Sequence, residues 1–534
     1  MFRGIAIFGL PGSGKTAIAK ALAETINIKF YEASKCIIYP LANKIIPDTD
    51  DELIKLLLSR DSAESGNIPT ISRTTARKIY SDLVSKHGEN IIGRIIVDKM
   101  FQDASIITGL RGVSNAKYLY ENQYLVIYLS ASKEELVKRI LTRHLQTEAE
   151  IAWSNQPALG GQGEILDDID AEENMYDTSK ISQYAHLSFD TTMYSIKYIA
   201  DFIIQLFNTK ECRICANINY NPVTPIGDNG LCIVCNNYQN NFDQDNLKKE
   251  LEFVKSFITN KKSYDVIVGM SGGKDSTVTA YKLLEMGFRP LGFTLDIGYY
   301  PTHIMTRAAD IAKILHIDHE IINIQNTITE NNRESYRLTH ELYNEPDSEQ
   351  LSQRFRQLYI ENRKHYSVKD TTVMPFVRSC QLCRKTVIPA YYNEAVKRGI
   401  SLVVLGINEW TSLSQPCDGF TVSGIRRLQP TPTQPVVYIV HLPFLLRLPR
   451  PEMETILNKI GWTPPSGEEL IEANTNSCLF AAATLEKARH MLGFNPDITR
   501  LSREVTVGFI TKAEAKRALD KHYNNTLSLE KLII

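Results

Sequence analysis

Cysteine pairs are the residues of this chain whose spacing most directly implies chemistry. The 534 residues include nine cysteines, and six of these form three Cys-x-x-Cys pairs. The first two pairs give the pattern C-x2-C-x16-C-x2-C, and four thiolates at that spacing close a tetrahedral zinc site. We expect a structural zinc ion here, and a redox role is the alternative. The expected ligands are Cys212, Cys215, Cys232 and Cys235.

The third pair is Cys380 and Cys383, and a lone cysteine, Cys478, follows far downstream. Three thiolates would leave zinc or iron with one open coordination position, which a closed structural site lacks. Two other interpretations stay open: a zinc site completed by His365 or His441, and reduced thiols that only pack. The cysteines without a partner by spacing, expected to be packing or surface thiols, are Cys36 and Cys417.

Two glycine-rich loops have the composition of phosphate sites. The first, GLPGSGKT at 9–16, follows an apolar strand pattern and precedes a helical one. Its backbone N–H groups would cradle phosphate oxygens, Lys15 would neutralise the transferred group, and the Thr16 hydroxyl would ligate Mg²⁺. The loop residues expected to bind phosphate are Gly9, Gly12, Gly14, Lys15 and Thr16.

The second loop, SGGKDST at 271–277, also joins a strand pattern to a helix pattern but lacks the first loop's spacing. Glycines let its backbone close on phosphate oxygens at a helix N-terminus, and serine hydroxyls can donate to them. We expect Asp275 to hold Mg²⁺ and Lys274 to add positive charge. The remaining residues expected to bind phosphate are Ser271, Gly272, Gly273 and Ser276.

Short apolar strands alternate with amphipathic helices around both loops. This alternation predicts an α/β fold with two doubly wound parallel sheets, one around each loop. The helical patterns near the end of the chain predict a helical C-terminal region. The expected domains are a first nucleotide-binding domain at 1–208, a zinc ribbon at 209–240, a second nucleotide-binding domain at 241–445, and a helical region at 446–534 that carries Cys478.

The overall composition is that of a soluble globular protein: 43% hydrophobic residues, 23% charged residues and a net charge of −1. No apolar run has the length of a membrane span, so we expect no membrane partner. The N-terminus enters the first loop directly, which is unlike a signal peptide. We therefore expect a cytoplasmic protein, where cysteines at these spacings favour metal over disulfides.

Residues 1 to about 190 resemble nucleoside-monophosphate and dephospho-coenzyme A kinases, with a P-loop and the segments SIITGLRG and YLVIYLSASKEELVKRILTRH. The resemblance implies that Arg111, Arg139 and Arg143 contact phosphates, the last two from a lid. Arg73 and Arg77 are further candidates for substrate phosphate. The chain departs from the family at Thr108, where an acidic residue is frequent, and Glu32 is the expected substitute.

The second loop resembles the SGGxDS loop of the PP-loop ATP pyrophosphatase superfamily, whose nucleotide-binding domain is of the HUP-like type. The resemblance implies adenylation: a substrate oxygen takes AMP from ATP, pyrophosphate leaves, and a nucleophile then displaces AMP. Asp296 lies where the superfamily contacts adenosine. A zinc ribbon followed by YDVIVGMSGG, together with the tail LSREVTVGFITKAEAKRAL, resembles the N-acetyl sugar amidotransferase branch over 210–534.

The third cysteine pair resembles that of ATP-dependent tRNA-thiolation enzymes. In both, a Cys-x-x-Cys precedes a helix, a strand and a G-x-N turn, here Gly406 to Asn408, and a third cysteine comes later. The resemblance implies that Cys380, Cys383 and Cys478 hold a [4Fe–4S] cluster with one open iron, which can bind the attacking sulfur.

These observations leave three functions open. The first is an ATP- and Mg²⁺-dependent sulfurtransferase, fused to a kinase for the same or a related small molecule. The second is an ammonia-using amidotransferase with zinc alone. A donor protein is a possible source of sulfur for the first, and ammonia for the second would come from a partner subunit or from free solution. The third is a nucleotide-sensing regulator. The neutral charge balance shows no stripe that would follow a phosphate backbone, so we favour a nucleotide-like or sugar-like substrate over tRNA.

Overall fold

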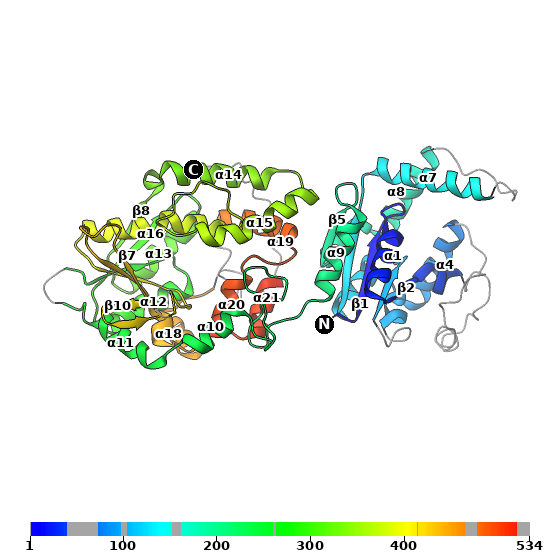
Figure 1. The fold of residues 1–534 in the computed structure, drawn as a ribbon. Coiled ribbons are helices and arrows are strands. Elements are labelled where there is room, and N and C mark those ends of the chain that lie inside the picture. Colours follow the sequence, from blue (N-terminus) through cyan, green and yellow to red (C-terminus); the bar gives the residue numbers. More distant parts are fainter. Residues whose placement is uncertain are drawn as a thin grey trace. The chain divides into compact units, whose positions relative to one another are not determined.

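The computed structural model describes residues 2–39, 73–97, 104–151, 162–259, 263–413, 415–464 and 478–520. The chain divides into two compact units, Met1–Thr209 with Asp347–Glu349, and Lys210–Pro346 with Gln350–Ile534. Figure 1 colours the first unit blue to cyan-green and the second green to red.

The first unit is built on a parallel five-stranded sheet of order β2-β3-β1-β4-β5. Alternate residues of β1 point to opposite faces, because side chains alternate along a strand. Ile5 and Ile7 pack with α1 and α9, whereas Ala6 and Phe8 pack with α4, α5 and α6. Its strands are β1 (Gly4–Gly9), β2 (Lys29–Glu32), β3 (Ser105–Thr108), β4 (Tyr124–Ser130) and β5 (Leu187–Asp190). Its helices are α1 (Lys15–Ile26), η1 (Ser34–Ile38), α4 (Arg73–His87), α5 (Ile91–Ile95), α6 (Val113–Glu121), α7 (Lys133–Ile151), α8 (Gln162–Tyr176), η4 (Thr178–Tyr184) and α9 (Ile196–Phe207).

The second unit has a six-stranded sheet of order β12-β13-β9-β6-β7-β8. Its strands are parallel except for the edge strand β12, which runs antiparallel to β13 and was not anticipated from the sequence. A small antiparallel hairpin, β10 with β11, precedes that edge. The strands are β6 (Val266–Gly269), β7 (Pro290–Asp296), β8 (His319–Asn323), β9 (Leu402–Leu405), β10 (Gln415–Cys417), β11 (Phe420–Val422), β12 (Ile425–Leu428) and β13 (Val437–His441).

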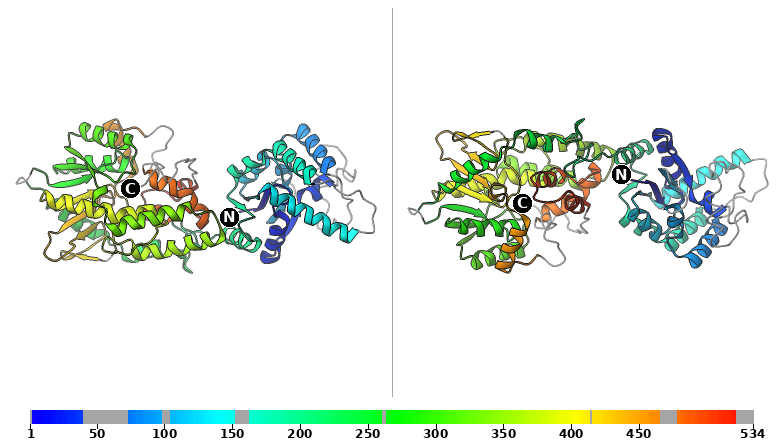
Figure 2. Two further views of the ribbon diagram at one scale, coloured as in Figure 1. Left: turned by 90° about the horizontal axis from the view of Figure 1, so that it is seen from above. Right: turned by 90° about the horizontal axis from the view of Figure 1, so that it is seen from below.

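Helices cover this sheet, as the two further views of the ribbon show (Figure 2). The buried side chains of the four-cysteine segment, the sheet and the C-terminal helices form one continuous core. The helices are α10 (Ile233–Asn241), α11 (Gln244–Lys255), α12 (Lys274–Glu285), α13 (Thr302–Ile314), η5 (Gln325–Thr327), α14 (Glu330–Asn344), α15 (Glu349–His365), α16 (Ser379–Lys397), α17 (Leu442–Leu446), α18 (Arg450–Ile460), α19 (Leu479–Leu492), α20 (Ile498–Thr506) and α21 (Lys512–Asp520).

The predicted α/β fold, with parallel sheets around both loops and a helical C-terminal region, is confirmed. One predicted helical pattern, at 467–474, lies outside the described residues. Strand order reverses next to β1 in the first sheet and between β6 and β9 in the second, and ligands of open α/β sheets bind at such reversals. Across the described ranges, no helix has the length and apolarity needed to cross a lipid bilayer.

Candidate functional site

The first glycine loop connects β1 to α1 through glycines in the left-handed region. Gly9, Gly12 and Gly14 have φ of +144°, +83° and +87°, values at which a side chain would be strained. Lys15 Nζ donates to the carbonyl oxygens of Gly9 and Leu10, each at 2.7 Å. The ammonium therefore lies over its own loop, at the N-terminus of α1, where a phosphate would bind.

An acidic side chain reaches this loop from β2. Thr16 Oγ1 donates to Glu32 Oε1 at 3.0 Å, so the hydroxyl and the carboxylate expected to serve Mg²⁺ are in contact. Glu32 pairs in register with Thr108 at the end of β3. Thr108 is buried, and its hydroxyl has no hydrogen-bond partner within the part of the chain that the structure describes. The carboxylate that contacts Thr16, the expected Mg²⁺ ligand, is therefore that of Glu32 on β2.

Two of the predicted arginines are held by buried or half-buried carboxylates of α8. Arg111 Nε lies 2.9 Å from Glu172 Oε1, and Glu172 is only 3% exposed. Arg77 Nη2 lies 2.6 Å from Asp168 Oδ1. Arg73 begins α4, and its side chain lies outside the described residues. The two ion pairs fix α8 beside the loop and orient Arg111 toward it.

The two arginines of α7 differ in their surroundings. Arg139 donates to Thr191 Oγ1 at 2.7 Å and to the Thr191 carbonyl at 2.9 Å, and it also reaches the Gly12 carbonyl at 3.3 Å. It therefore braces the phosphate loop against the end of β5. Arg143 is exposed and lines the space above the loop, and its role in a lid stays a prediction.

Two adjoining cavities lie at the carboxyl edge of this sheet. One, of about 150 Å³, lies over the glycine loop and is lined by Lys15, Thr16 and Glu32 among others. The other, of about 230 Å³, is lined partly by apolar side chains such as Ile38 and Ile92. Four residues line both cavities: Ser34, Gly109, Arg111 and Arg143. A nucleotide phosphate over the loop and a small acceptor next to it would share these cations.

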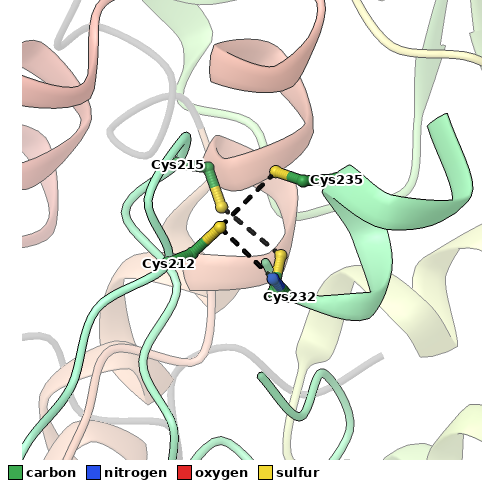
Figure 3. Close-up of side chains that lie close together, drawn as sticks. All are labelled: Cys212, Cys215, Cys232 and Cys235. Carbon is green, nitrogen blue, oxygen red and sulfur yellow. Dashed lines mark hydrogen bonds between the residues drawn. The ribbon is translucent and has the colours of Figure 1, made fainter. Parts of the chain in front are cut away.

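The four ribbon cysteines converge on one point (Figure 3). Their sulfurs all lie within 4.8 Å of one another, and all four side chains are fully buried. The Cys212 and Cys235 sulfurs are 3.7 Å apart, and those of Cys215 and Cys232 are 3.5 Å apart. Thiolates bound 2.3 Å from one tetrahedral ion stand about 3.8 Å apart. The set therefore fits one zinc-sized ion with no open ligand position.

The last two helices brace this ribbon. Thr506 Oγ1 in α20 lies 3.1 Å from Cys235 Sγ. Lys512 Nζ in α21 donates to the Cys212 carbonyl at 2.7 Å. The ribbon is therefore a packing platform for the C-terminal region, as a structural metal site would be.

The second glycine loop connects β6 to α12, and its two serines hold its shape. Ser271 Oγ lies 3.1 Å from Ser276 Oγ, and the Ser276 hydroxyl donates to the Gly273 carbonyl at 3.0 Å. Gly272 has φ of +67°, and a Cβ there would lie 2.9 Å from the Ala308 nitrogen. The loop thus needs glycine both for its conformation and for its close contact with α13.

The turn after β9 positions the carboxylate expected to hold Mg²⁺. Lys274 Nζ lies 2.7 Å from Asp275 Oδ2, and Asn408 Nδ2 donates to Asp275 Oδ1 at 3.1 Å. A Cβ on Gly406 would lie 2.8 Å from the Asp275 carbonyl carbon. The G-x-N turn therefore packs directly on the loop, at the reversal of strand order.

Two further groups border this loop. Asp296 ends β7, and its Oδ1 accepts a 2.8 Å hydrogen bond from the Gly298 N–H, so it shapes the turn next to the loop. Trp462, which the sequence did not single out, donates its indole N–H to the Gly272 carbonyl at 3.0 Å. The Arg307 guanidinium lies 4.6 Å from the centroid of the Trp462 ring system. These residues cover the side of the loop that faces α13.

The three remaining predicted ligands come from two helix N-termini. Cys380 and Cys383 lie in the first two turns of α16, and Cys478 occupies the N-cap position of α19. The Leu479 N–H donates to the Tyr299 carbonyl at 3.0 Å, which ties the start of α19 to the segment after β7. Burial raises the pKa of the Cys383 thiol, and Cys478 and Cys380 raise it further. The three thiols are therefore near enough to influence one another.

The three thiols do not form a single-ion site. Considering described residues only, the ribbon is the one group of three or more Cys, His or carboxylate ligands whose atoms all lie within 4.8 Å. His365 Nδ1 lies 3.0 Å from Asp370 Oδ2, and His441 Nδ1 lies 2.7 Å from the Glu409 carbonyl. Neither histidine completes a zinc set with the cysteines in this arrangement. A cluster of several iron ions needs more widely spaced thiolates than one zinc ion does.

Charged residues that the sequence did not single out surround the cysteine pair. Arg378 Nη2 lies 2.9 Å from Asp497 Oδ1, and Arg500 Nη1 lies 2.7 Å from Glu504 Oε1. Burial raises the pKa of Glu504, while Lys274 lowers it. Glu504, which pairs with Arg500 on α20, therefore lies close enough to Lys274 of the second glycine loop to be influenced by its charge.

Known proteins resemble parts of the chain. Residues 246–371, which include the second glycine loop, match the family model of NAD synthase. An uncharacterized protein of Methanocaldococcus jannaschii is 22% identical over 58% of this chain and 93% of its own. The tRNA-specific 2-thiouridylase MnmA 2 of Fusobacterium nucleatum is 39% identical over 66 residues, which cover 11% of this chain and 18% of that enzyme.

Solved structures similar to the chain include two shikimate kinases. That of Acinetobacter baumannii, in complex with shikimate, is 16% identical, covers 39% of this chain and 93% of its own, and has a TM-score of 0.24. That of Bacteroides thetaiotaomicron is 16% identical, covers 39% and 99%, and has a TM-score of 0.22. Values this low carry no functional conclusion, so the phosphate site of the first unit is inferred from its own loop. The two phosphate loops and the NAD synthase match identify the chain as an ATP-using enzyme.

Proposed function

We propose that the second unit is an adenylating sulfurtransferase and that the first unit is a kinase for a nucleotide-like or sugar-like small molecule. The observation that carries the proposal is the position of Cys380 and Cys383 at the start of α16 and of Cys478 at the start of α19, two helices that contact each other. The similarity to a protein named tRNA-specific 2-thiouridylase supports sulfur as the transferred atom.

Adenylation would use the residues that hold the second loop. The loop backbone and the hydroxyls of Ser271 and Ser276 bind the phosphates that become pyrophosphate. Asp275, oriented by Asn408 at 3.1 Å, would hold Mg²⁺ against them. The substrate oxygen attacks the α-phosphorus, the bond from that phosphorus to the pyrophosphate oxygen breaks, and Lys274 stabilises the negative charge that leaves.

Sulfur transfer would follow at the cysteine side. Hydrosulfide from a donor protein attacks the activated carbon, the carbon–oxygen bond breaks, AMP leaves, and no electron is gained or lost. When bound by three thiolates, a [4Fe–4S] cluster has one iron without a protein ligand, which supplies a binding position for that hydrosulfide. Cys380, Cys383 and Cys478 would hold the cluster, and the buried Tyr299, whose pKa is raised by burial and by two of these cysteines, helps to exclude water.

Phosphoryl transfer in the first unit would take place between its two adjoining cavities. Lys15 and the loop backbone would hold the nucleotide phosphates, and Glu32 with Thr16 would position Mg²⁺. The acceptor would lie in the cavity of about 230 Å³, where Arg111 and Arg143 face both ligands. A volume of this size suits one small polar molecule.

An ammonia-using amidotransferase is the second candidate. One observation favours it: the three thiols do not make up a compact ligand set among the residues described. In this reaction ammonia attacks the adenylated carbon, AMP leaves, and only the ribbon holds metal. Ammonia would then come from a partner subunit or from solution.

Metal analysis after anaerobic purification separates the two candidates. Sulfur transfer predicts about one zinc and about four iron atoms per chain, with the iron lost and the zinc kept in Cys478→Ala. Cys36→Ala, which removes a lone thiol of the first unit, is the matched control. Zinc without iron after reconstitution would exclude the cluster, and exchange of labelled pyrophosphate into ATP tests adenylation in either case.

A further inference from the structure

Three arginines on different helices gather near the second loop with little opposing charge. They are Arg363 at the end of α15, Arg384 in α16 and Arg503 in α20, and all are half-buried. Arg503 Nη1 lies 3.3 Å from Glu409 Oε2. Within the described ranges, Arg363 and Arg384 have no ion pair with any carboxylate.

Unlike Arg363 and Arg384, other arginines near the second loop do have carboxylate partners. The neighbouring Arg378 and Arg500 are neutralised by Asp497 and Glu504. Among the described residues, Glu409 is the one carboxylate that forms an ion pair with any of the three guanidiniums, so these pairs leave an excess charge of about +2. Half-buried positive charge is costly unless an anion balances it.

The three arginines lie near one another: Tyr366, whose ring the Arg384 guanidinium faces, follows Arg363 by three residues, and burial and the Arg503 charge both lower the pKa of Arg384. The Arg384 guanidinium lies 5.2 Å from the Tyr366 ring centroid, and that of Arg503 lies 5.4 Å from Trp410. Burial lowers the pKa of Arg363, and Arg503 lowers it further. Arg503 Nε is buried, with no hydrogen-bond partner among the residues placed in the structure. Guanidiniums that lie over aromatic rings, as those of Arg384 and Arg503 do, can still donate N–H groups from their edges to a ligand.

The arginine group lies between the two halves of the proposed chemistry. Glu409 directly follows Asn408, which contacts Asp275 of the second loop at 3.1 Å. Arg384 directly follows Cys383. A molecule held by the three arginines would therefore lie within reach of both the adenylating loop and the cysteines.

We propose that Arg363, Arg384 and Arg503 bind a phosphomonoester group of the substrate that the second unit adenylates. This inference rests on the proposed function. A phosphomonoester carries about −1.5 to −2 charges at pH 7 and three acceptor oxygens, which matches the excess charge and the fork geometry of guanidinium groups. The first unit would supply such a phosphate, so the two activities act in sequence on one small molecule.

Phosphate binding by the full-length chain tests this assignment without ATP, cluster or substrate. We would measure equilibrium dialysis of labelled inorganic phosphate against protein carrying Lys15→Ala, which weakens the first loop. Arg363→Gln and Arg503→Gln should each weaken binding about tenfold or more, and Arg363→Lys should restore part of it. Arg354→Gln, an exposed charge change on the same helix, should have no effect.

Each other outcome overturns the assignment. Loss of phosphate in Ser276→Ala, with Arg363→Gln unaffected, would place the anion at the pyrophosphate loop. Retention of a tRNA pool that depends on Arg363, without binding of free phosphate, would identify an RNA backbone site. Absence of any binding that depends on these arginines would also reject it. Failure of sulfur transfer leaves the measurement unaffected, because neither the cluster nor adenylation takes part in it.

Discussion

The two groups of cysteines in the second unit differ in how they are assembled. The ribbon sulfurs come from two turns close in sequence and lie 3.5 to 3.7 Å apart where measured. The sulfurs of Cys380, Cys383 and Cys478 come from the starts of two helices that are far apart in the sequence, and they form no set within 4.8 Å in the described part of the chain. The ribbon sulfurs are positioned to bind a single metal ion, whereas those of Cys380, Cys383 and Cys478 are not.

Under the proposed function, the two groups of thiolates serve different purposes. A compact, fully buried set leaves no ligand position open, so its metal can only stabilise the fold. A group drawn from the N-termini of α16 and α19, with Cys380 reaching solvent, leaves space for a larger cofactor and a substrate. The predictions below test this contrast, beginning with the largest effect.

Removal of one ribbon ligand should have the largest effect. Cys232→Ala breaks the four-thiolate set on which α20 and α21 pack, and structural zinc contributes most of the stability of such ribbons. We expect loss of zinc and a fall in melting temperature of roughly 10 °C or more, measured by metal analysis and calorimetry. The control is Cys36→Ala, and full zinc content with an unchanged melting temperature would contradict the structural role.

Removal of the Cys478 thiol should abolish sulfur transfer and leave the fold intact. Cys478→Ala should reduce iron from about four atoms per chain to near none and lower sulfur transfer by about a hundredfold or more. Zinc content and ATP–pyrophosphate exchange should remain, because neither the ribbon nor the second loop is altered. Iron that persists in this variant would show that Cys478 is not a ligand.

His441 should make the folded state less stable at acidic pH. Burial lowers the pKa of His441 from 6.5 to about 4, and Arg384 and Arg503 add to this effect. The folded state therefore binds fewer protons than the unfolded state between these values. The free energy of unfolding should therefore fall by about 3 kcal/mol in total as the pH drops from 6.5 to 4.

The variant His441→Asn should reduce this loss of stability at acidic pH, measured by urea unfolding between pH 4 and 6.5. His303→Asn, which changes an exposed histidine, is the control for the chemical change alone. Parallel profiles for wild type and His441→Asn would show that another group is responsible.

Loss of the hydroxyl beside the ribbon should have the smallest effect. Thr506 Oγ1 lies 3.1 Å from Cys235 Sγ and can donate to the thiolate once metal is bound. Thr506→Val keeps the side-chain volume, and we expect zinc affinity to fall about tenfold, measured by competition with a chelator. Thr455→Val, on an exposed face of α18, is the control, and equal affinities would show that the contact is incidental.

Much of the fold followed from local patterns in the sequence. Both glycine loops stand between an apolar strand and a helix, and these elements depend on contacts within some thirty residues. The ribbon spacing likewise implied a compact thiol set, because its four ligands lie close in sequence. The order of Cys380, Cys383 and Cys478 was recognised only through resemblance, and their ligand role stays a prediction.

The charged surroundings of the second loop could not be predicted from the sequence. Asp497, Arg500 and Glu504 follow helical spacing, which is equally typical of a solvated helix face. Tertiary packing turned this face inward, toward Arg378 and the second loop. Glu250 is a similar case: it is fully buried and accepts hydrogen bonds from Ser423 and Gly424.

The contact of Trp462 with the second glycine loop gives the protein an optical signal of its own. The indole N–H that now bonds to the Gly272 carbonyl at 3.0 Å would sense any rearrangement of the loop around pyrophosphate. A second indole, that of Trp410, lies near Arg503, whose guanidinium carbon is 5.4 Å from the ring centroid. Replacing one or the other of these two tryptophans with phenylalanine would separate their fluorescence signals. The two signals would then report the binding of nucleotide and of acceptor independently and in real time.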